Sequence, residues 1–309
     1  VTFEECIVAG NPLEGIYGEG STVIVNHCAI TQNGCGLHFT SCVSTVDGGT
    51  VSANSGPWGY AGGLQVEGGS CTVKNAVFES NYSAYHGGAM AFYSNATGQI
   101  LNTDILRNAA SVPGAVLVSG CTLTFENDLF TLNQQWPVLG QNYGAPAFVN
   151  CLFFGNSDAS CYFDESYGRY YASADELNLN CPNASGNVGG DPSLAAALFS
   201  GTLTADAAYD SATHRTTFTD TSKSFTAGGL IGATVLLADG AAGVVLNNTA
   251  TQFEVFGDYS GNGLSGTGYD VVNYHLADGS QAIDRGSLAN ASATDFEGDA
   301  RPGGDGMVD

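Results

Sequence analysis

The sequence predicts an all-β protein whose larger part is a parallel β-solenoid of about seven coils. The 309 residues include 43 Gly, 16 Phe and 14 Tyr, which favours tight turns and aromatic-bearing strands over long helices. Short apolar strands recur every 21–27 residues, and no helical segment separates them. A unit of that size cannot bury its own apolar face. The units must therefore stack, so that each strand pairs with its equivalent in the next coil.

Asparagine marks the repeat. Each copy lies three residues after an apolar residue, and successive copies are 22, 21, 27, 27, 25 and 23 residues apart. The seven copies are Asn11, Asn33, Asn54, Asn81, Asn108, Asn133 and Asn156. Asparagine tolerates the left-handed backbone of a sharp turn, and stacked side-chain amides hydrogen-bond along an axis. We therefore expect these residues to form a structural ladder in register.

A second strand follows the first five asparagines after a few residues. It begins with glycine and continues with apolar residues, as in Gly36-Leu37-His38-Phe39 and Gly63-Leu64-Gln65-Val66. Each coil therefore supplies at least two short strands joined by tight turns. At a strand spacing of about 4.8 Å, seven coils give a rod of roughly 30–35 Å.

Two motifs carry a family resemblance. Phe78-Glu79-Ser80-Asn81 and Phe130-Thr131-Leu132-Asn133 match an FxxN pattern, and Gly87-Gly88-Ala89-Met90 is similar to its usual companion, GGA with an aliphatic residue. The repeats over about residues 1–166 resemble those of chlamydial polymorphic outer membrane proteins and, more broadly, the right-handed parallel β-helix family. The resemblance implies a right-handed β-helix at a cell surface.

The repeat spacing is lost from about residue 167. Residues 1–194 are expected to form the parallel β-helix, and residues 195–272 a small all-β insertion. Asp239-Gly240 is a strong hairpin turn within that insertion. Residues 273–309 are expected to return to the end of the β-helix.

The C-terminal segment carries a second resemblance. Gly279-Ser280-Gln281-Ala282-Ile283-Asp284 and Thr294-Asp295-Phe296-Glu297-Gly298 are similar to the choice-of-anchor Q segment of secreted bacterial β-helix proteins. Gln281 stands where that family usually has proline. The resemblance implies an exported bacterial protein, and it supplies no catalytic residues.

Charge excludes several functions. Seven Lys and Arg against 30 Asp and Glu give a net charge of −23, which argues against binding nucleic acid or an anionic membrane through a basic patch. No apolar run is long enough for membrane insertion. The nine cysteines include no CxxC pair, and they suit an oxidising compartment. We therefore expect an extracellular or cell-surface location.

Some cysteines are candidates for disulfides. Cys6 and Cys28 occupy the same position in neighbouring coils, where their Cα atoms are within disulfide range. Cys161 and Cys181 flank the close of the solenoid and form the second candidate pair. The alternative is that buried free thiols serve as small core residues.

Catalytic residues are not predicted. Asp104 and Asp128 are the best candidate carboxylate pair for a polysaccharide hydrolase, although they are one residue out of register and a solvated face explains them more simply. Of the basic residues, only Lys74 and Arg107 fall in solenoid strands, and no acidic cluster matches them as a lyase would need. A polysaccharide lyase or hydrolase is therefore the least favoured function.

No cofactor is expected apart from calcium. Acidic side chains in the glycine-rich C-terminal loop are candidate calcium ligands, although a solvated acidic loop is the simpler interpretation. They are Asp295, Glu297, Asp299 and Asp305. The five histidines show no ligand spacing, and we expect them at the surface or in turns.

The ends of the solenoid suggest a function. Phe3 already belongs to the first strand, and an uncovered coil exposes a row of unpaired backbone groups. We expect either a trimmed N-terminus or a neighbouring subunit. The favoured interpretation is an extracellular structural protein whose copies stack head to tail into a filament.

The alternative function is a carbohydrate-binding or adhesive surface module. Its candidate residues are aromatic side chains near turns, which stack on sugar rings. They are Trp58, Tyr60, Tyr82, Tyr85 and Trp136.

Overall fold

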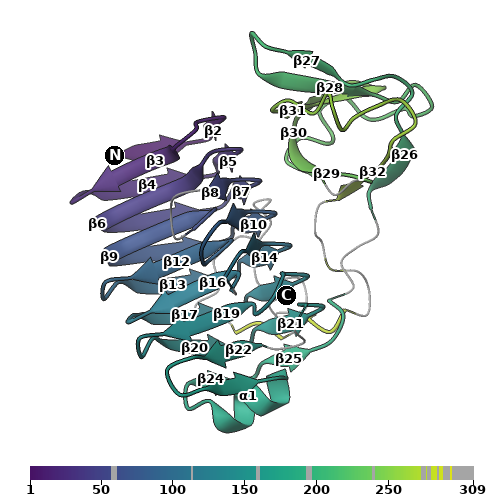
Figure 1. The fold of residues 1–309 in the computed structure, drawn as a ribbon. Helices are drawn as coiled ribbons and strands as arrows, with labels where there is room; N and C mark the ends of the chain where they lie inside the picture. The colour runs from purple at the N-terminus through teal and green to yellow at the C-terminus, as the bar shows by residue number, and fades with distance from the viewer. Residues whose placement is uncertain are drawn as a thin grey trace. The chain divides into compact units, whose positions relative to one another are not determined.

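Parallel strands stacked along one axis make up the larger of two compact units in the computed structural model (Figure 1). The structure describes residues 1–56, 61–112, 114–157, 161–192, 197–238, 241–272, 276, 280–283, 285–287 and 293. Unit 1 comprises Val1–Ser193 and Gly279–Asp309, and unit 2 comprises Leu194–Asp278. The predicted all-β solenoid with a β-rich insertion is the observed fold.

Sheet A is the largest sheet of unit 1, with 14 strands. All its pairs are parallel except the last hairpin, β22 with β23. Its strands are β1 (Thr2–Glu4), β3 (Glu14–Glu19), β4 (Thr22–Asn26), β6 (Cys35–Asp47), β9 (Leu64–Lys74), β12 (Met90–Tyr93), β13 (Thr97–Leu101), β16 (Val116–Ser119), β17 (Thr122–Glu126), β19 (Val138–Gln141), β20 (Ala145–Val149), β22 (Tyr162–Asp164), β23 (Arg169–Tyr171) and β24 (Ala184–Ser185). The long strands β6 and β9 each span two faces of the solenoid, because β6 pairs with β3 along its first half and with β4 along its second.

Two further sheets complete the coils. Sheet B has eight strands in coil order: β2 (Ile7–Ala9), β5 (Ala29–Thr31), β7 (Thr50–Ser52), β10 (Val77–Glu79), β14 (Asp104–Leu106), β18 (Leu129–Thr131), β21 (Leu152–Phe154) and β25 (Val188–Gly189). Sheet C has three: β8 (Ser55–Gly56), β11 (Tyr82–Ser83) and β15 (Ala109–Ala110). Every pairing in sheets B and C is parallel and joins neighbouring coils.

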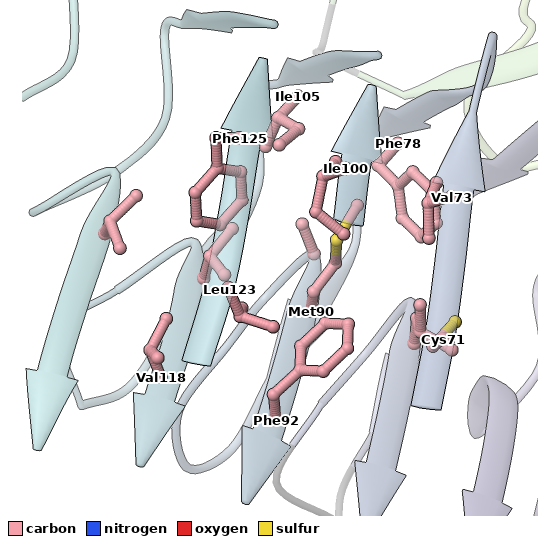
Figure 2. Close-up of a cluster of buried hydrophobic side chains, with 14 of the residues drawn as sticks. Cys71, Val73, Phe78, Met90, Phe92, Ile100, Ile105, Val118, Leu123 and Phe125 are labelled. Carbon is pink, nitrogen blue, oxygen red and sulfur yellow. The ribbon is translucent and has the colours of Figure 1, made fainter. Parts of the chain in front are cut away.

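The core lies inside the coils, where equivalent side chains of successive coils stack. Figure 2 shows part of it, with Val73, Ile100 and Phe125 from one face pointing toward Met90 and Phe92 from another. Nearer the last coils, phenylalanine rings form stacked pairs along the axis, Phe125 with Phe148 at 5.3 Å and Phe130 with Phe153 at 4.9 Å between centroids. Like side chains at strand spacing pack against one another along the axis, which explains the small set of residue types in the repeat.

The seven asparagines form one column between sheets B and C. The side-chain Oδ1 of each one after Asn11 accepts a bond from the backbone N–H and from the Nδ2 of the asparagine one coil earlier, with Nδ2–Oδ1 distances from 2.9 to 3.2 Å. From Asn33 to Asn156, each Nδ2 also donates to a backbone carbonyl of the preceding coil. The amide therefore satisfies backbone groups that a turn otherwise leaves buried and unpaired.

A short helix, α1 (Ala174–Asn180), lies over the last coil (Figure 1). Ser173 caps its N-terminus, because its Oγ accepts from the backbone N–H of Glu176 at 3.1 Å. Ala174 and Leu177 are buried in the solenoid core. The helix therefore covers the apolar interior at the end of the solenoid, beyond which no further strand of the described residues stacks.

Unit 2 is an antiparallel sheet of seven strands with its own core. Phe218, Phe253 and Val255 are fully buried in it. The predicted Asp239-Gly240 turn lies outside the described residues, between the paired strands β29 and β30. The strands are β26 (Phe199–Thr202), β27 (Ala208–Asp210), β28 (Arg215–Thr219), β29 (Thr234–Leu237), β30 (Ala242–Asn248), β31 (Gln252–Phe256) and β32 (Gly268–Val272).

Candidate functional site

One outer face of sheet A carries the polar and aromatic side chains that a ligand can reach. It is formed by β3, the first halves of β6 and β9, and β12, β16, β19 and β22. Side chains alternate along these strands, so Leu37 and Phe39 of β6 enter the core while His38 and Thr40 point outward. We call this surface the outer face.

The first feature of the outer face is a polar column, with one hydrogen-bonding side chain from each of six coils. Backbone register places these residues side by side at the spacing of parallel strands, about 4.8 Å. All are half-buried except Glu19, which is exposed. In coil order the polar column is Glu19, Thr40, Glu67, Tyr93, Ser119 and Gln141.

A neighbouring column on the outer face is polar in the first coils and apolar in the later coils. Tyr17, His38 and Gln65 form its polar part. The next three coils supply Ala91, Leu117 and Leu139, which are at most 2% exposed and pack with Ala61, Trp136 and Phe163. The polar part of this column therefore lies next to an apolar part that other side chains cover.

Hydrogen bonds connect four side chains across four coils of the outer face. His38 Nδ1 lies 3.3 Å from Glu14 Oε1, and His38 Nε2 lies 3.0 Å from Gln65 Nε2. Gln65 Nε2 also donates to the hydroxyl of Tyr93. Because a carboxylate only accepts and an amide nitrogen only donates, these contacts match the imidazole tautomer with the proton on Nδ1 and the lone pair on Nε2.

The second feature is an aromatic cluster around the β22–β23 hairpin. Trp136 lies 4.3 Å from Phe163, and Phe163 stacks on Tyr170 at 4.1 Å between ring centroids. Tyr143 and Tyr167 meet edge to face at 5.8 Å. Tyr143, Tyr167 and Tyr170 are 73%, 63% and 53% exposed, so these rings present their surfaces to solvent.

The predicted carboxylate pair is not a pair in the structure. Asp104 lies opposite Leu129 in the strand register, whereas Asp128 Oδ1 accepts from the backbone N–H of Thr103 at 2.8 Å. Asp128 is buried, and burial raises its pKa well above the usual range. The interpretation of Asp128 as part of a solvated face is therefore wrong, since its side chain lies inside the solenoid.

The predicted disulfides are not formed, because all nine cysteines are free thiols. Cys6 and Cys28 do occupy equivalent places in neighbouring coils, but each thiol donates to a carbonyl of its own coil, Cys6 to Glu4 at 3.1 Å and Cys28 to Asn26 at 3.2 Å. Cys161 and Cys181 are buried in the core of the last coils. The thiols thus act as small core residues, the alternative that the sequence left open.

Lys74 and Arg107, the two basic residues predicted in solenoid strands, are held in ion pairs. Lys74 Nζ lies 2.8 Å from Asp47, and Arg107 lies 2.7 Å from the buried carboxylate of Glu79. No group of three or more metal-ligating side chains occurs among the described residues. The calcium candidates Asp295, Glu297, Asp299 and Asp305 lie outside that part of the chain.

Two of the predicted aromatic candidates, Trp58 and Tyr60, also lie outside the described residues. Tyr82 and Tyr85 are exposed beside sheet C, and Trp136 belongs to the aromatic cluster. The structure therefore brings Trp136 together with Phe163 and Tyr170, and it leaves Tyr82 on a different face.

Sequence reasoning missed His38 as a site residue, because the prediction placed histidines at the surface or in turns. His38 lies in the first half of β6, half-buried on the outer face. A signal was present, since Tyr17, His38 and Gln65 each follow a glycine by two residues in the recurrent glycine-led strand. Alternation along such a strand assigns that position to the outer face.

Residues 1–135 match the family model described as a right handed beta helix region. The matched residues are less than half of the chain, and together with the stacked parallel strands they support a right-handed parallel β-helix fold for the solenoid of unit 1. Comparison with curated proteins and with solved structures finds no match. Within the described residues, no helix has the length and apolar character to cross a membrane.

Proposed function

We propose that this β-helix is an extracellular glycan-binding protein, with a polysaccharide lying along the polar column and stacking on the aromatic cluster. The observation that carries the proposal is one half-buried hydrogen-bonding side chain per coil, in register from Thr40 to Gln141. A sugar chain offers hydroxyl groups at a similar repeat, and an exposed aromatic ring offers an apolar surface to the face of a sugar ring.

Charge narrows the class of glycan. Glu19 and Glu67 belong to the polar column, and the chain has a net charge of −23. A uronate polysaccharide is repelled by this surface, whereas a neutral or amino-sugar polymer is not. The proposed ligand is therefore a neutral or cationic glycan.

Affinity electrophoresis against a panel of polysaccharides tests the proposal. We expect retardation by neutral or amino-sugar polymers, and about tenfold weaker binding for Tyr143→Ala or Tyr167→Ala, since one stacked ring contributes about 1 kcal/mol or more. Tyr82→Ala is the matched control, because Tyr82 is also exposed but belongs to sheet C. Equal loss for Tyr82→Ala, or binding confined to uronates, contradicts the proposal.

Stacking into a filament is a second candidate function. In the described residues, β1, β2 and β3 each pair on one side only, with β4, β5 and β6. Val1 and Leu13 beside them are 75% and 64% exposed. Such an edge accepts a further coil, from the same chain or from another copy.

The other end of the solenoid limits this second candidate. Helix α1 lies over the last coil, so head-to-tail stacking requires α1 to move from the core that Leu177 fills. Electron microscopy and light scattering of the purified chain distinguish the cases. Filaments support head-to-tail stacking, and monodisperse monomers at high concentration contradict it.

A further inference from the structure

We propose that Thr40, His38 and Glu14 form a hydroxyl–imidazole–carboxylate triad that hydrolyses acyl esters, with Thr40 Oγ1 as the nucleophile. The three residues come from β3 and β6 on the outer face. His38 and Thr40 are two residues apart on one strand, so both side chains point to the same side. Glu14 reaches His38 from the preceding coil.

The distances give each residue its role. Thr40 Oγ1 lies 3.4 Å from His38 Nε2, and His38 Nδ1 lies 3.3 Å from Glu14 Oε1. With the proton on Nδ1 donated to Glu14, Nε2 is the basic nitrogen; its lone pair accepts from Gln65 in the unliganded protein and becomes available to the Thr40 hydroxyl when Gln65 turns to the substrate. A nucleophile beside a base that a carboxylate orients is the geometry of covalent acyl transfer, and such contacts are commonly longer in unliganded proteins.

The surroundings keep the triad reachable and ordered. The side chain of His38 is 17% exposed and that of Glu14 is 35% exposed, so a ligand reaches both. Tyr17 packs edge-on against the imidazole with centroids 5.1 Å apart, which restricts its rotation. Gln65 Nε2 lies 3.0 Å from His38 Nε2 and is the amide donor nearest the reacting nitrogen.

In the first step, Thr40 Oγ1 attacks the carbonyl carbon of the ester while its proton passes to His38 Nε2. Gln65 Nε2–H turns from Nε2 to the carbonyl oxygen and stabilises the negative charge that forms there. The bond from the carbonyl carbon to the alcohol oxygen then breaks, and the alcohol leaves with the proton from Nε2. Glu14 stabilises the imidazolium that exists between these two transfers.

In the second step, water replaces the alcohol. It gives a proton to His38 Nε2 and attacks the acyl carbon held on Thr40. The bond from that carbon to Thr40 Oγ1 breaks, and Oγ1 takes the proton back from Nε2. The balance is one ester and one water consumed, with one acid and one alcohol released, and no oxidant or metal is needed.

The class of ester that the triad accepts follows from the acidic side chains around it and from the role of Glu14. Glycoside hydrolysis uses two carboxyl groups across the scissile bond, whereas Glu14 is engaged with His38. Phosphate esters, and esters carried on polymers with free uronate groups, are anionic and are repelled by Glu14, Glu19 and Glu67. The structure therefore favours neutral acyl esters. The idea that a glycan carries the ester rests on the proposed function, whereas the triad itself is inferred from its geometry alone.

The test uses the full chain with p-nitrophenyl acetate, followed by intact-mass measurement and peptide mapping. We expect one acetyl group on Thr40 at short times, and loss of that label in Thr40→Ala and in His38→Gln. Thr40→Ser retains it, because a serine hydroxyl occupies the same place. Thr72→Ala is the matched control, because Thr72 is also a half-buried threonine of sheet A but lies in the second half of β9. We expect this variant to be acetylated on Thr40 as the parent is.

Three outcomes overturn the triad: no label, a label on Thr40 that persists in His38→Gln, or a label on residues other than Thr40. Unfolding midpoints of the variants must equal that of the parent, and Thr40→Ser reports activity even if Thr40→Ala is misfolded. The probe carries no sugar, so failure of glycan binding and failure of the triad give separate results.

Discussion

Two corners of the solenoid each turn the chain at a residue with positive φ, and they differ in whether one side chain recurs beside it. At the corner between sheets B and C, the positive-φ residue varies, as at Gln32 and Leu132, but the residue after it is asparagine in every coil from Asn11 to Asn156. At the corner between sheets A and B, the turn residue has a positive φ in every coil, yet its identity varies among Asn, Gly, His and Glu. We call these the ladder corner and the variable corner.

The difference lies in what the side chain must do. At the ladder corner the side chain bonds to the neighbouring coil, so only asparagine serves. At the variable corner the residue after the positive-φ position also varies, from Gly49 to Asp128 and Asn187, so a side-chain bond to the next coil is optional there. Regularity in a sequence therefore records side-chain chemistry more than backbone shape.

Asp128, beside the variable corner, makes only part of the hydrogen bonding that an asparagine makes at this position. Asn187 fills the equivalent place in the last coil, where its Oδ1 accepts from Cys151 N–H at 2.9 Å and its Nδ2 donates to the carbonyl of Phe148 at 2.9 Å. Asp128 makes the first bond, to Thr103, but its Oδ2 is buried without a partner. A protonated carboxyl supplies the donor that Asn187 has, consistent with the raised pKa of Asp128.

The largest expected effect is at the ladder corner. Asn81→Ala removes the acceptor for Asn54 and the donor to Val51 and Asn108, all buried. We expect a loss of at least about 3 kcal/mol in urea unfolding, because each buried unsatisfied group costs about 1–3 kcal/mol. Asn11→Ala, at the half-buried end of the column, is the control and should cost about 1 kcal/mol. Equal losses contradict a cooperative ladder.

The next effect is at Asp128. Its pKa is raised in the folded protein, so the unfolded chain loses this proton first as the pH rises. The stabilisation is therefore complete below about pH 4 and declines as the pH rises toward the folded-state pKa, by about 1.4 kcal/mol for each pH unit between the unfolded-state and folded-state pKa values. Asp128→Asn should match the parent near pH 4 and exceed it at pH 8 in urea midpoint.

Two results contradict this account of Asp128. One is a difference between variant and parent that does not change with pH. The other is a variant less stable than the parent at pH 8. Asp104→Asn tests the neighbouring charge, because Asp104 repels the ionised form of Asp128 and contributes to its raised pKa, so this variant should lose less stability than the parent between pH 4 and pH 8.

The smallest effect concerns the thiols. Burial raises the pKa of Cys28 and of Cys151 beside the variable corner, and raises that of Cys35 and of Cys71 to about 12. Thiolate is the reactive form, so the folded chain at pH 8 should react with a chromogenic disulfide reagent at Cys6 at most. All of the thiols should react after denaturation, nine in total. A lower final count indicates disulfides and contradicts the free-thiol structure.

The ladder corner explains how much the sequence predicts. The spacing of asparagines led to the right fold class, because a side-chain bond repeated in each coil leaves a periodic mark. The site is less visible, because Glu14, His38 and Gln65 meet only after coils of different lengths are aligned. Equal position in neighbouring coils also suggested the Cys6–Cys28 disulfide, but position alone does not set the direction of the thiols.

The ladder also has a direction, since every asparagine before the last donates to the one that follows it along the chain. If the coil that contains Asn54 were removed, Asn33 would face Asn81, which offers the same amide oxygen as acceptor. An inserted coil with its own asparagine would also offer this acceptor. Gene segments encoding single coils are therefore interchangeable at this corner. Proteins of this design can lengthen or shorten by duplication and deletion without new chemistry at the joint.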